Sequence, residues 1–178
     1  MKANLTEINL KEFNPQVFDL WDNVWFVLTC GDFIRGEFNA MTVGWGGFGI
    51  MWNKPMAMIV VRPTRFTYQF LNSFDTFSLC AFDDQFKPAL QVLGSKSGRD
   101  CDKINLAGLS PIASNLIAAP VYRESDLNIE CRKLYWEDLN PNHFLTSDIN
   151  KNYPERDYHR LVIGEVFTIH GDASKYCI

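Results

Sequence analysis

Short runs of β-forming residues separated by turn residues dominate the first third of the sequence. The run 24–30, VWFVLTC, is apolar and ends at Gly31-Asp32, which predicts a strand closed by a turn. A second strand is expected over 33–43, with a β-bulge at Gly36. It leads into a glycine cluster, which predicts backbone that another group approaches closely: Gly44, Gly46, Gly47 and Gly49. Residues 1–22 show no sustained periodicity.

A third strand and a short helix are expected next. The run 56–61, MAMIVV, is continuous, apolar and of strand length, and it begins directly after Pro55. Apolar residues then recur at helical spacing within 64–73. The pattern predicts a helix over these residues with Thr64 as its N-cap.

The same alternation of strand and short helix continues. Residues 76–82, TFSLCAF, are typical of a strand. A helix is expected through 88–94, with Asp83 or Asp84 as its cap and Gly94 at its end.

After a polar loop, residues 102–108 predict a helical turn, and 109–120 form a connection interrupted by prolines. The segment 126–136 alternates apolar and polar residues, as a half-buried strand does. Its inward side chains, allowing a slip of one residue before the last, are Leu127, Ile129, Cys131 and Leu134.

The last predicted strand is 161–170, LVIGEVFTIH, which contains Gly164, and 171–178 is expected to form a tail. About six strands with two or three short helices, and no repeated unit of strand and long helix, favour a mainly β fold. We expect an antiparallel barrel with helical decoration rather than a doubly wound sheet, formed as a single domain over 1–178.

Composition restricts the function classes. A net charge of -4 and the absence of a long basic run argue against nucleic acid as the partner. The N-terminal segment is polar, and no apolar run approaches the roughly 20 residues that span a bilayer, so a cytoplasmic protein without a membrane partner is expected. The five cysteines include no C-x-x-C pair, which favours free thiols over disulfides or a metal site.

Charge is unevenly distributed along this acidic chain. Between Glu37 and Asp75 the only formal charges are cations, namely Lys54, Arg62 and Arg65. Aromatic residues, at 14% of the chain, are also frequent here. A segment of this kind suits a planar anionic ligand.

One motif in this segment does not have its usual meaning. Residues 44–49 match the G-x-G-x-x-G expression of dinucleotide-binding folds. In those folds a helix follows the glycines, and an acid about 20 residues later contacts the ribose. Here Pro55 and a strand follow, and no acid occurs before Asp75. We therefore reject a Rossmann site.

Two polar clusters are candidates for phosphate binding. Arg62, Thr64, Arg65 and Thr67 lie where a strand gives way to a helix, and free amide groups at a helix N-terminus attract anions. Alternatively, Thr64 only caps the helix and the arginines are solvated. The second cluster, Lys96-Ser97-Gly98-Arg99 with Lys103, suits phosphate or ribityl contacts, or is a solvated loop.

Flat hydrophobic side chains accompany amide and hydroxyl groups nearby, a mixture that can hold an isoalloxazine ring: Met41, Thr42, Trp45, Trp52 and Asn53. At least one of the two tryptophans, Trp45 and Trp52, is expected to be a core residue. His159, in Asp157-Tyr158-His159-Arg160, is expected to contact a ligand or to lie at the surface, and His143 and His170 are expected to be structural. The H-E-x-x-H, G-x-S-x-G and P-loop motifs are absent, which removes common hydrolase and nucleoside-triphosphatase sites.

Taken together, these segments resemble the flavin reductase-like family with the FMN-binding split barrel, and most closely its flavoredoxin branch. The matching pieces occur in the family's order and span most of the chain: N-A-M-T-V-G-W-G-G at 39–47, G-I-M-W-N-K-P at 49–55, V-R-P-T-R-F-T at 61–67, K-S-G-R-D at 96–100, D-K at 102–103, A-G-L-S-P at 107–111, D-Y-H at 157–159 and I-G-E-V at 163–166.

The resemblance implies a Greek-key split barrel, noncovalent FMN, and a homodimer with two flavin sites near the subunit interface. In this family's pattern the phosphate would contact Arg62, Thr64, Arg65 and Thr67; the ring would contact Asn39, Met41, Thr42, Trp45, Trp52, Asn53 and Lys54; and the ribityl chain would contact Lys96, Ser97 and Arg99. Two departures leave the electron donor open. Asp157-Tyr158-His159 replaces a typical Gly-Asp-His triplet, and Met-Trp-Asn-Lys-Pro replaces a serine-rich loop.

The leading hypothesis is an FMN-dependent oxidoreductase that takes a hydride from NADH or NADPH and passes electrons to a small-molecule or protein acceptor, with His159 near the nicotinamide or flavin edge. A second is a flavoredoxin-type electron carrier with a protein redox partner and no nicotinamide. A third is a split barrel that binds another ligand and no flavin.

Overall fold

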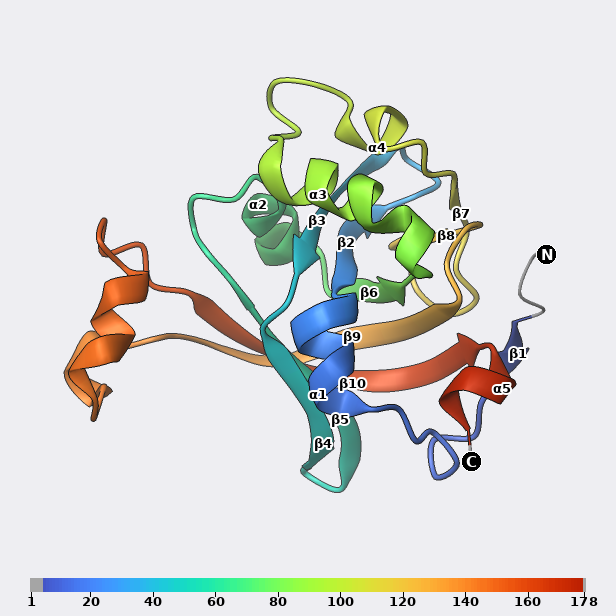
Figure 1. The fold of residues 1–178 in the computed structure, drawn as a ribbon, viewed down its shortest axis with the longest axis horizontal. Coiled ribbons are helices and arrows are strands. Elements are labelled where there is room, and N and C mark those ends of the chain that lie inside the picture. Colours follow the sequence, from blue (N-terminus) through green and yellow to red (C-terminus); the bar gives the residue numbers. More distant parts are fainter. Residues whose placement is uncertain (1–4, 178) are drawn as a thin grey trace.

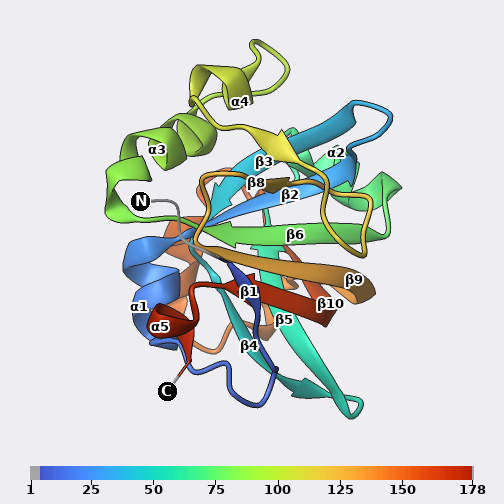
Figure 2. The same ribbon diagram turned by 90° about the vertical axis from the view of Figure 1, so that its right-hand side faces the viewer.

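The computed structural model describes residues 5–177 and is built around one antiparallel β-sheet (Figures 1 and 2). Its strands follow the order β3-β2-β6-β9-β10-β5-β4, and β1 pairs with the end of β10. These strands are β1 (Thr6–Glu7), β2 (Phe26–Asp32), β3 (Glu37–Val43), β4 (Gly46–Met51), β5 (Lys54–Val61), β6 (Thr76–Ala81), β9 (Leu127–Asp138) and β10 (Arg160–Gly171). Two short strands, β7 (Pro111–Ile112) and β8 (Val121–Tyr122), pair with each other. The predicted mainly β, antiparallel fold is confirmed.

The helices are short. They are α1 (Val17–Asp19), which continues as the π-helical turn Leu20–Val24, then α2 (Thr67–Ser73), α3 (Lys87–Ser95), α4 (Lys103–Leu106) and α5 (Ala173–Tyr176), with 3-10 turns at Asp84–Phe86, Pro141–His143 and Ser147–Asn152. Figures 1 and 2 both show α2, α3 and α4 gathered beside β2 and β3. Within residues 5–177 no helix is long and apolar enough to cross a membrane.

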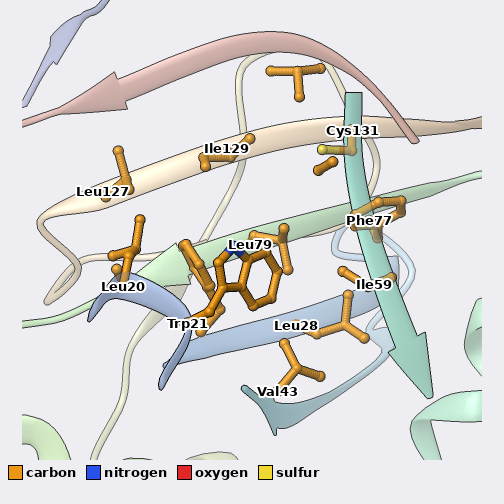
Figure 3. Packing of buried hydrophobic residues seen from close by; sticks show 14 of the residues in the cluster. Leu20, Trp21, Leu28, Val43, Ile59, Phe77, Leu79, Leu127, Ile129 and Cys131 are labelled. Carbon is orange, nitrogen blue, oxygen red and sulfur yellow. The ribbon is translucent and has the colours of Figure 1, made fainter. Parts of the chain in front are cut away.

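The helices explain why β2 is apolar along its whole length. Phe26 and Leu28 point into the barrel interior, whereas Val27 packs against a second cluster that includes Leu90 of α3. Both faces of the strand are therefore buried, and the sequence shows a continuous apolar run instead of an alternating one. Figure 3 shows the interior cluster, where Trp21 lies between residues of β2, β5, β6 and β9.

The glycine cluster forms a strand that the sequence reasoning did not predict. Gly46 pairs with Ile59 at the start of β4, and a Cβ atom added to Gly46 would lie 2.4 Å from the Met58 carbonyl oxygen and 2.4 Å from the Trp21 ring. The groups that approach this backbone closely therefore belong to the same chain. At the other end of the hairpin, Trp52 and Asn53 have φ values of 52° and 57°, as the two central residues of a type I′ turn require.

The first hairpin turns later than predicted. Gly31 and Asp32 belong to β2, and the chain reverses over 33–36, where the Gly36 amide donates to the Phe33 carbonyl oxygen (3.1 Å). Gly36 has a φ of 67° and lies in this turn instead of forming a bulge. The strand expected over 33–43 therefore begins at Glu37.

Three helix boundaries also differ from the predictions. Thr64 is not the N-cap of α2, because Pro63 occupies a turn closed by the Arg65 amide and the Arg62 carbonyl oxygen (3.1 Å), and the helix begins three residues later. Neither expected aspartate caps α3 through its side chain, since a 3-10 turn precedes that helix. Gly94 lies within α3, which ends at Ser95.

The one-residue slip expected in the strand 126–136 is present as a shift in the pairing register between β9 and β10. Ile163 of β10 pairs with Tyr135 and Gly164 pairs with Lys133, so Leu134 between them has no partner in the ladder. β9 itself extends two residues further, to Asp138.

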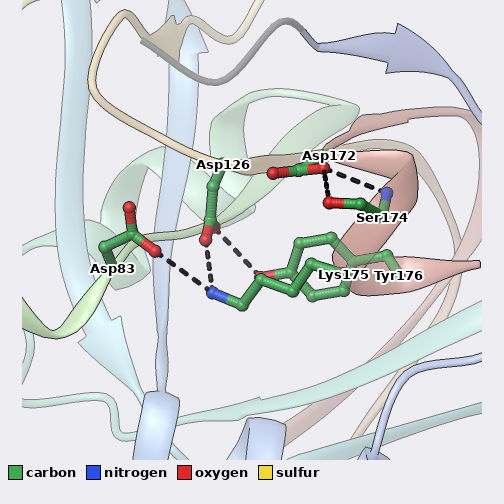
Figure 4. A network of polar contacts seen from close by, with 6 residues as sticks. All are labelled: Asp83, Asp126, Asp172, Ser174, Lys175 and Tyr176. Carbon is green, nitrogen blue, oxygen red and sulfur yellow. Dashed lines mark hydrogen bonds and ion pairs between the residues drawn. The ribbon is translucent and has the colours of Figure 1, made fainter. Parts of the chain in front are cut away.

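The C-terminal segment is a docked helix and not a tail. The buried carboxylate of Asp126 accepts hydrogen bonds from Lys175 Nζ (2.5 Å) and from the Tyr176 hydroxyl (3.0 Å), as Figure 4 shows. Asp172 caps α5 by accepting from the Ser174 amide (3.0 Å). Asp83, at 3.4 Å from Lys175 Nζ, completes the network. Burial raises the pKa of Asp126, and its bond with Lys175 opposes that shift.

Candidate functional site

A cavity of about 220 Å³ opens where the end of β3, the start of β4, the end of β5 and the start of β10 meet. Its walls are Met41, Thr42, Val43, Gly44, Trp45, Val60, Arg62, Arg65 and His159. These residues include two arginines and no carboxylate. The main chain of Gly44 and Trp45 lies between β3 and β4, outside both ladders. The cavity therefore combines positive charge, main chain outside the β ladders and aromatic surface.

Trp45 and His159 form the aromatic wall. Their ring centroids are 5.1 Å apart, and Trp45 remains 51% exposed. Trp52 is 57% exposed, so the expectation that one of these two tryptophans is a core residue is wrong. His159 is only 8% exposed, and its Nδ1 is 2.8 Å from the Tyr153 hydroxyl. Burial, with a smaller contribution from Arg62, lowers the pKa of His159 to about 4. The imidazole at this wall is therefore neutral at pH 7, and the expectation of a surface histidine is wrong.

Arg62 connects the cavity to a protruding arm, residues 139–159 (orange in Figure 1). Its Nη1 donates to both carboxylate oxygens of Asp157 (2.7 and 2.8 Å), and its Nη2 donates to the Asn152 carbonyl oxygen (2.7 Å). The guanidinium also lies 5.1 Å from the centre of the Tyr153 ring. The hydrogen bonds from Arg62 lower the pKa of the Asp157 carboxyl group. Arg62 is thus not a solvated arginine.

Arg65 points from the cavity towards the C-terminal end of α3. Its Nη2 donates to the carbonyl oxygens of Gly94 (2.7 Å) and Leu93 (3.4 Å), where the helix dipole is negative. Lys103 is buried nearby, and its Nζ donates to Leu93 and Lys96 carbonyl oxygens, both at 3.2 Å. Burial, followed by the neighbouring charge of Arg65, lowers the pKa of Lys103 to about 8.

Several predicted ligand contacts form the scaffold behind the cavity. Asn39 donates to Thr67 Oγ1 (2.7 Å), and both side chains are buried. Thr42 lines the cavity, but its hydroxyl donates to the Leu90 carbonyl oxygen (2.5 Å). Thr64 is exposed and does not line the cavity. Asn39 thus joins β3 to α2, and Thr42 joins β3 to α3, and these two contacts fix the cavity wall.

The loop 96–99 packs against the segment that carries the arginines, so it is not simply a solvated loop. Arg99 donates to the Thr64 carbonyl oxygen (3.4 Å) and lies 4.9 Å from the Phe66 ring centre. A Cβ atom added to Gly98 would come within 2.3 Å of Asn39 Oδ1. The two cationic clusters predicted from the sequence are therefore neighbours, although neither Lys96 nor Ser97 lines the cavity.

The hairpin residues Trp52, Asn53 and Lys54 lie away from this cavity. Lys54 is six residues from Val60 along β5, a distance of about 20 Å in an extended strand. Trp52 instead contacts Tyr135 of β9, and Lys54 pairs with Glu165 of β10 (2.5 Å). One chain does not bring these residues together with Arg65.

Sequence reasoning did not single out Tyr153 or Val60 as site residues. Tyr153 lies in the polar segment that precedes β10, and only the folded arm places its hydroxyl against His159. Val60 belongs to a continuous apolar run that carries no signal of a cavity. Within residues 5–177 no group of three or more histidine, cysteine, aspartate or glutamate side chains could hold a metal ion, and all five cysteines are free.

Known proteins support this architecture. Many solved structures match, and three of them illustrate the range. An FMN-binding domain of a flavin reductase-like enzyme from Shewanella baltica OS155 is 17% identical, with 97% of this chain and 80% of that one covered at a TM-score of 0.69. The flavoredoxin of Desulfovibrio vulgaris (Miyazaki F) is 18% identical, with 95% of this chain and 78% of that one covered at a TM-score of 0.65. An NADH:FAD oxidoreductase of Streptomyces globisporus C-1027 is 17% identical, with 82% of this chain and 73% of that one covered at a TM-score of 0.62. At these identities the similarity shows a shared fold, the split β-barrel, as expected. No curated protein matches the chain.

The family model described as flavin reductase like domain matches residues 21–176, which include every strand of the sheet except β1 and every residue of the cavity wall. The chain therefore belongs to the flavin reductase-like family.

Proposed function

We propose that the chain is an FMN-dependent oxidoreductase that moves electrons from a reduced nicotinamide cofactor through FMN to an acceptor. The observation that carries this proposal is the cavity itself, where two arginines and a neutral histidine surround a half-exposed indole without any carboxylate. A flat anion is the ligand that such walls complement. The family and the fold support the same chemistry.

The residues present fit a flavin. Trp45 would offer its face to the isoalloxazine ring, and the main chain of Gly44 and Trp45, which lies outside the β ladders, would hydrogen-bond the ring edge. Arg65 would bind the phosphate, since a guanidinium forms strong charge-assisted hydrogen bonds with phosphate oxygens. Arg62 is a second candidate for that contact, in competition with Asp157.

When bound, FMN would supply the redox chemistry by accepting a hydride from nicotinamide and passing electrons to an acceptor. The protein residues would bind, orient and tune. Arg65, or Arg62, would hold the phosphate, and His159 would present a neutral imidazole to the ligand. No general acid or base is required of the protein.

We also propose a homodimer. The cavity of about 220 Å³ is below the usual range of roughly 300–1,000 Å³ for ligand pockets, which suggests that one chain provides only part of the site. The tip of the β4–β5 hairpin carries three exposed apolar side chains, Ile50, Met51 and Trp52, and the exposed Tyr135 of β9 contacts Trp52. A second copy covering this surface would allow Trp52, Asn53 and Lys54 to reach the flavin of the partner chain.

A flavoredoxin-type carrier, which binds FMN but exchanges electrons with a protein and not with nicotinamide, is the second candidate. Two observations favour it. The fold matches a flavoredoxin over 95% of this chain. In addition, Asp157 and Tyr158 stand in place of the Gly and Asp of the Gly-Asp-His triplet, and Arg62 binds the carboxylate of Asp157.

The decisive experiment has two steps. The absorption spectrum of freshly purified protein, followed by denaturation and identification of the released chromophore, tests FMN binding. Anaerobic mixing with NADH and with NADPH then tests for bleaching of the visible flavin band. Bleaching supports the reductase, and a bound flavin that neither donor bleaches favours the carrier. A protein that stays colourless after FMN addition would contradict both.

A further inference from the structure

Tyr153 and His159 form a buried pair at the root of the arm. The Tyr153 hydroxyl is 2.8 Å from Nδ1 of His159, and the two rings meet edge to face with centroids 5.5 Å apart. Tyr153 is 6% exposed and His159 is 8% exposed. On its other side the imidazole contacts Trp45. The histidine ring is therefore held between two aromatic residues, and its orientation is determined by packing.

The donor in the hydrogen bond between Tyr153 and His159 can be assigned, because both groups are buried and each polar hydrogen needs an acceptor. A neutral imidazole carries one N–H, so Nδ1 either accepts from the tyrosine hydroxyl or donates to it. If Nδ1 donated, the hydroxyl proton of Tyr153 would need another acceptor, and no second acceptor is in hydrogen-bond contact with it within residues 5–177. A buried donor without an acceptor is unfavourable, because it loses its hydrogen bond to water and gains none. Donation from Tyr153 to Nδ1 avoids this cost.

The other ring nitrogen faces the cavity. Within the described part of the chain, the one buried side-chain nitrogen or oxygen without a partner is Trp21 Nε1. His159 Nε2 has no hydrogen-bond partner there either, so it must be accessible to solvent. Because His159 lines the cavity and is otherwise enclosed, the accessible atom lies at the cavity surface.

We propose that Tyr153 is a positioning residue: its hydroxyl donates to Nδ1 of His159, keeps the imidazole proton on Nε2, and thereby turns His159 into a hydrogen-bond donor aimed into the cavity. The ligand must then present an acceptor atom to this wall, such as a ring nitrogen or carbonyl oxygen. This proposal deepens the proposed function, since the bound flavin or its redox partner would supply that acceptor.

The groups around the pair support a fixed neutral donor. Arg62 lies 5.1 Å from the Tyr153 ring centre and faces His159, and Asp157 neutralises part of its charge. Tyr158 and Phe144 pack against Tyr153 from the arm, at 5.0 and 5.9 Å between ring centroids. The positive charge of Arg62 and the burial of the ring both oppose protonation of the imidazole at neutral pH.

The test reads the tautomer directly. In the full chain labelled with ¹⁵N-histidine, the three histidines are resolved by NMR, and His159→Gln assigns the signal of His159. We expect the Nε2–H tautomer in the wild type and a mixture of tautomers in Tyr153→Phe, which keeps the ring and removes the hydroxyl. Tyr158→Phe is the matched control, since Tyr158 packs against Tyr153 without a hydrogen bond to His159, and it should leave the tautomer unchanged.

Titration with FMN gives the second readout. In the wild type the Nε2–H signal should move on saturation, and Tyr153→Phe should weaken FMN by about fivefold, as expected for one hydrogen bond. A predominant Nδ1–H tautomer in the wild type, or an unaltered tautomer in Tyr153→Phe, would overturn the proposal. The wild-type spectrum decides the point even if the variant does not fold. Nε2–H without any FMN binding would overturn the flavin assignment while supporting the role of Tyr153, so the two failures are distinguishable.

Discussion

Arg65 and Lys103 donate to the same main-chain oxygen, that of Leu93, at 3.4 and 3.2 Å. They come from different segments and converge on the C-terminal end of α3, where carbonyl groups without intrahelical partners accept their protons. Within residues 5–177 neither cation pairs with a carboxylate. Both side chains therefore bind the end of α3, with Arg65 at the cavity wall and Lys103 buried behind it.

Lys103 should make the free energy of unfolding depend on pH in the alkaline range. Its pKa is about 8 in the folded chain and 10.5 when exposed, so between these values the unfolded chain binds more protons at this residue. The free energy of unfolding should therefore rise with pH over this range, by up to roughly 3 kcal/mol from Lys103. Urea denaturation at several pH values, comparing Lys103→Met with the wild type, measures this contribution. The exposed Lys96→Met is the control and should retain the rise, and the same slope in Lys103→Met would contradict the assignment.

Arg65→Ala should weaken FMN by tenfold to a hundredfold, because a charge-assisted hydrogen bond contributes about 1.5–3 kcal/mol. Quenching of flavin fluorescence on titration with the protein gives the affinity. Arg35→Ala, which removes an exposed arginine in the 33–36 turn, should leave it unchanged. Equal affinity in Arg65→Ala and the wild type would remove Arg65 from the phosphate site.

Two adjacent glycines of β4 should respond differently to alanine. Gly46→Ala forces a methyl group against the Met58 carbonyl oxygen and the Trp21 ring, so it should destabilise the chain by about 1–3 kcal/mol. In Gly47→Ala the nearest atom to the new methyl group is Met58 Cε at 4.0 Å, and the change in stability should stay within about 0.5 kcal/mol. Thermal and urea unfolding of both variants tests the contrast, which similar stabilities would refute.

His159 should lower the free energy of unfolding of the chain at acidic pH. Its pKa is about 4 in the folded chain against 6.5 when exposed, so below pH 6.5 the unfolded state takes up more protons at this residue. The stability associated with the neutral imidazole is complete above pH 6.5 and should be lost as the pH falls towards 4, by up to roughly 3 kcal/mol. His159→Gln should lack this loss, and the exposed His143→Gln should keep it. Parallel pH profiles for the two variants would show that His159 is not the group.

The sequence predicts strands well where burial leaves a clear pattern and helix ends poorly where turns intervene. The apolar run of β2 and the alternation of β9 both identify their strands. β4 was missed because three of its six residues are glycines, which have low β propensity, and its stability comes from pairing with β5 and from contact with Trp21. The docked helix α5 was missed for a similar reason, since it depends on the distant Asp126.

The site follows the same division. Arg62, Arg65 and Trp45 could be singled out because an acid-free cationic segment is visible in the sequence, and the structure brings all three to one cavity. Other positions depend on how β3, β5 and α2 are placed in space. Trp52, Asn53 and Lys54 lie at a distant hairpin tip, and Thr67 is occupied by a buried hydrogen bond. Local sequence carries no information on that placement.

Arg62 lines the cavity, and the arm holds its guanidinium through Asp157 and Asn152. Any anion that draws this side chain inwards must compete with a bidentate carboxylate. Filling the cavity should therefore change how firmly Arg62 holds the arm, and a fluorescent label at the exposed position 145, introduced by Leu145→Cys, would detect that change from outside the cavity.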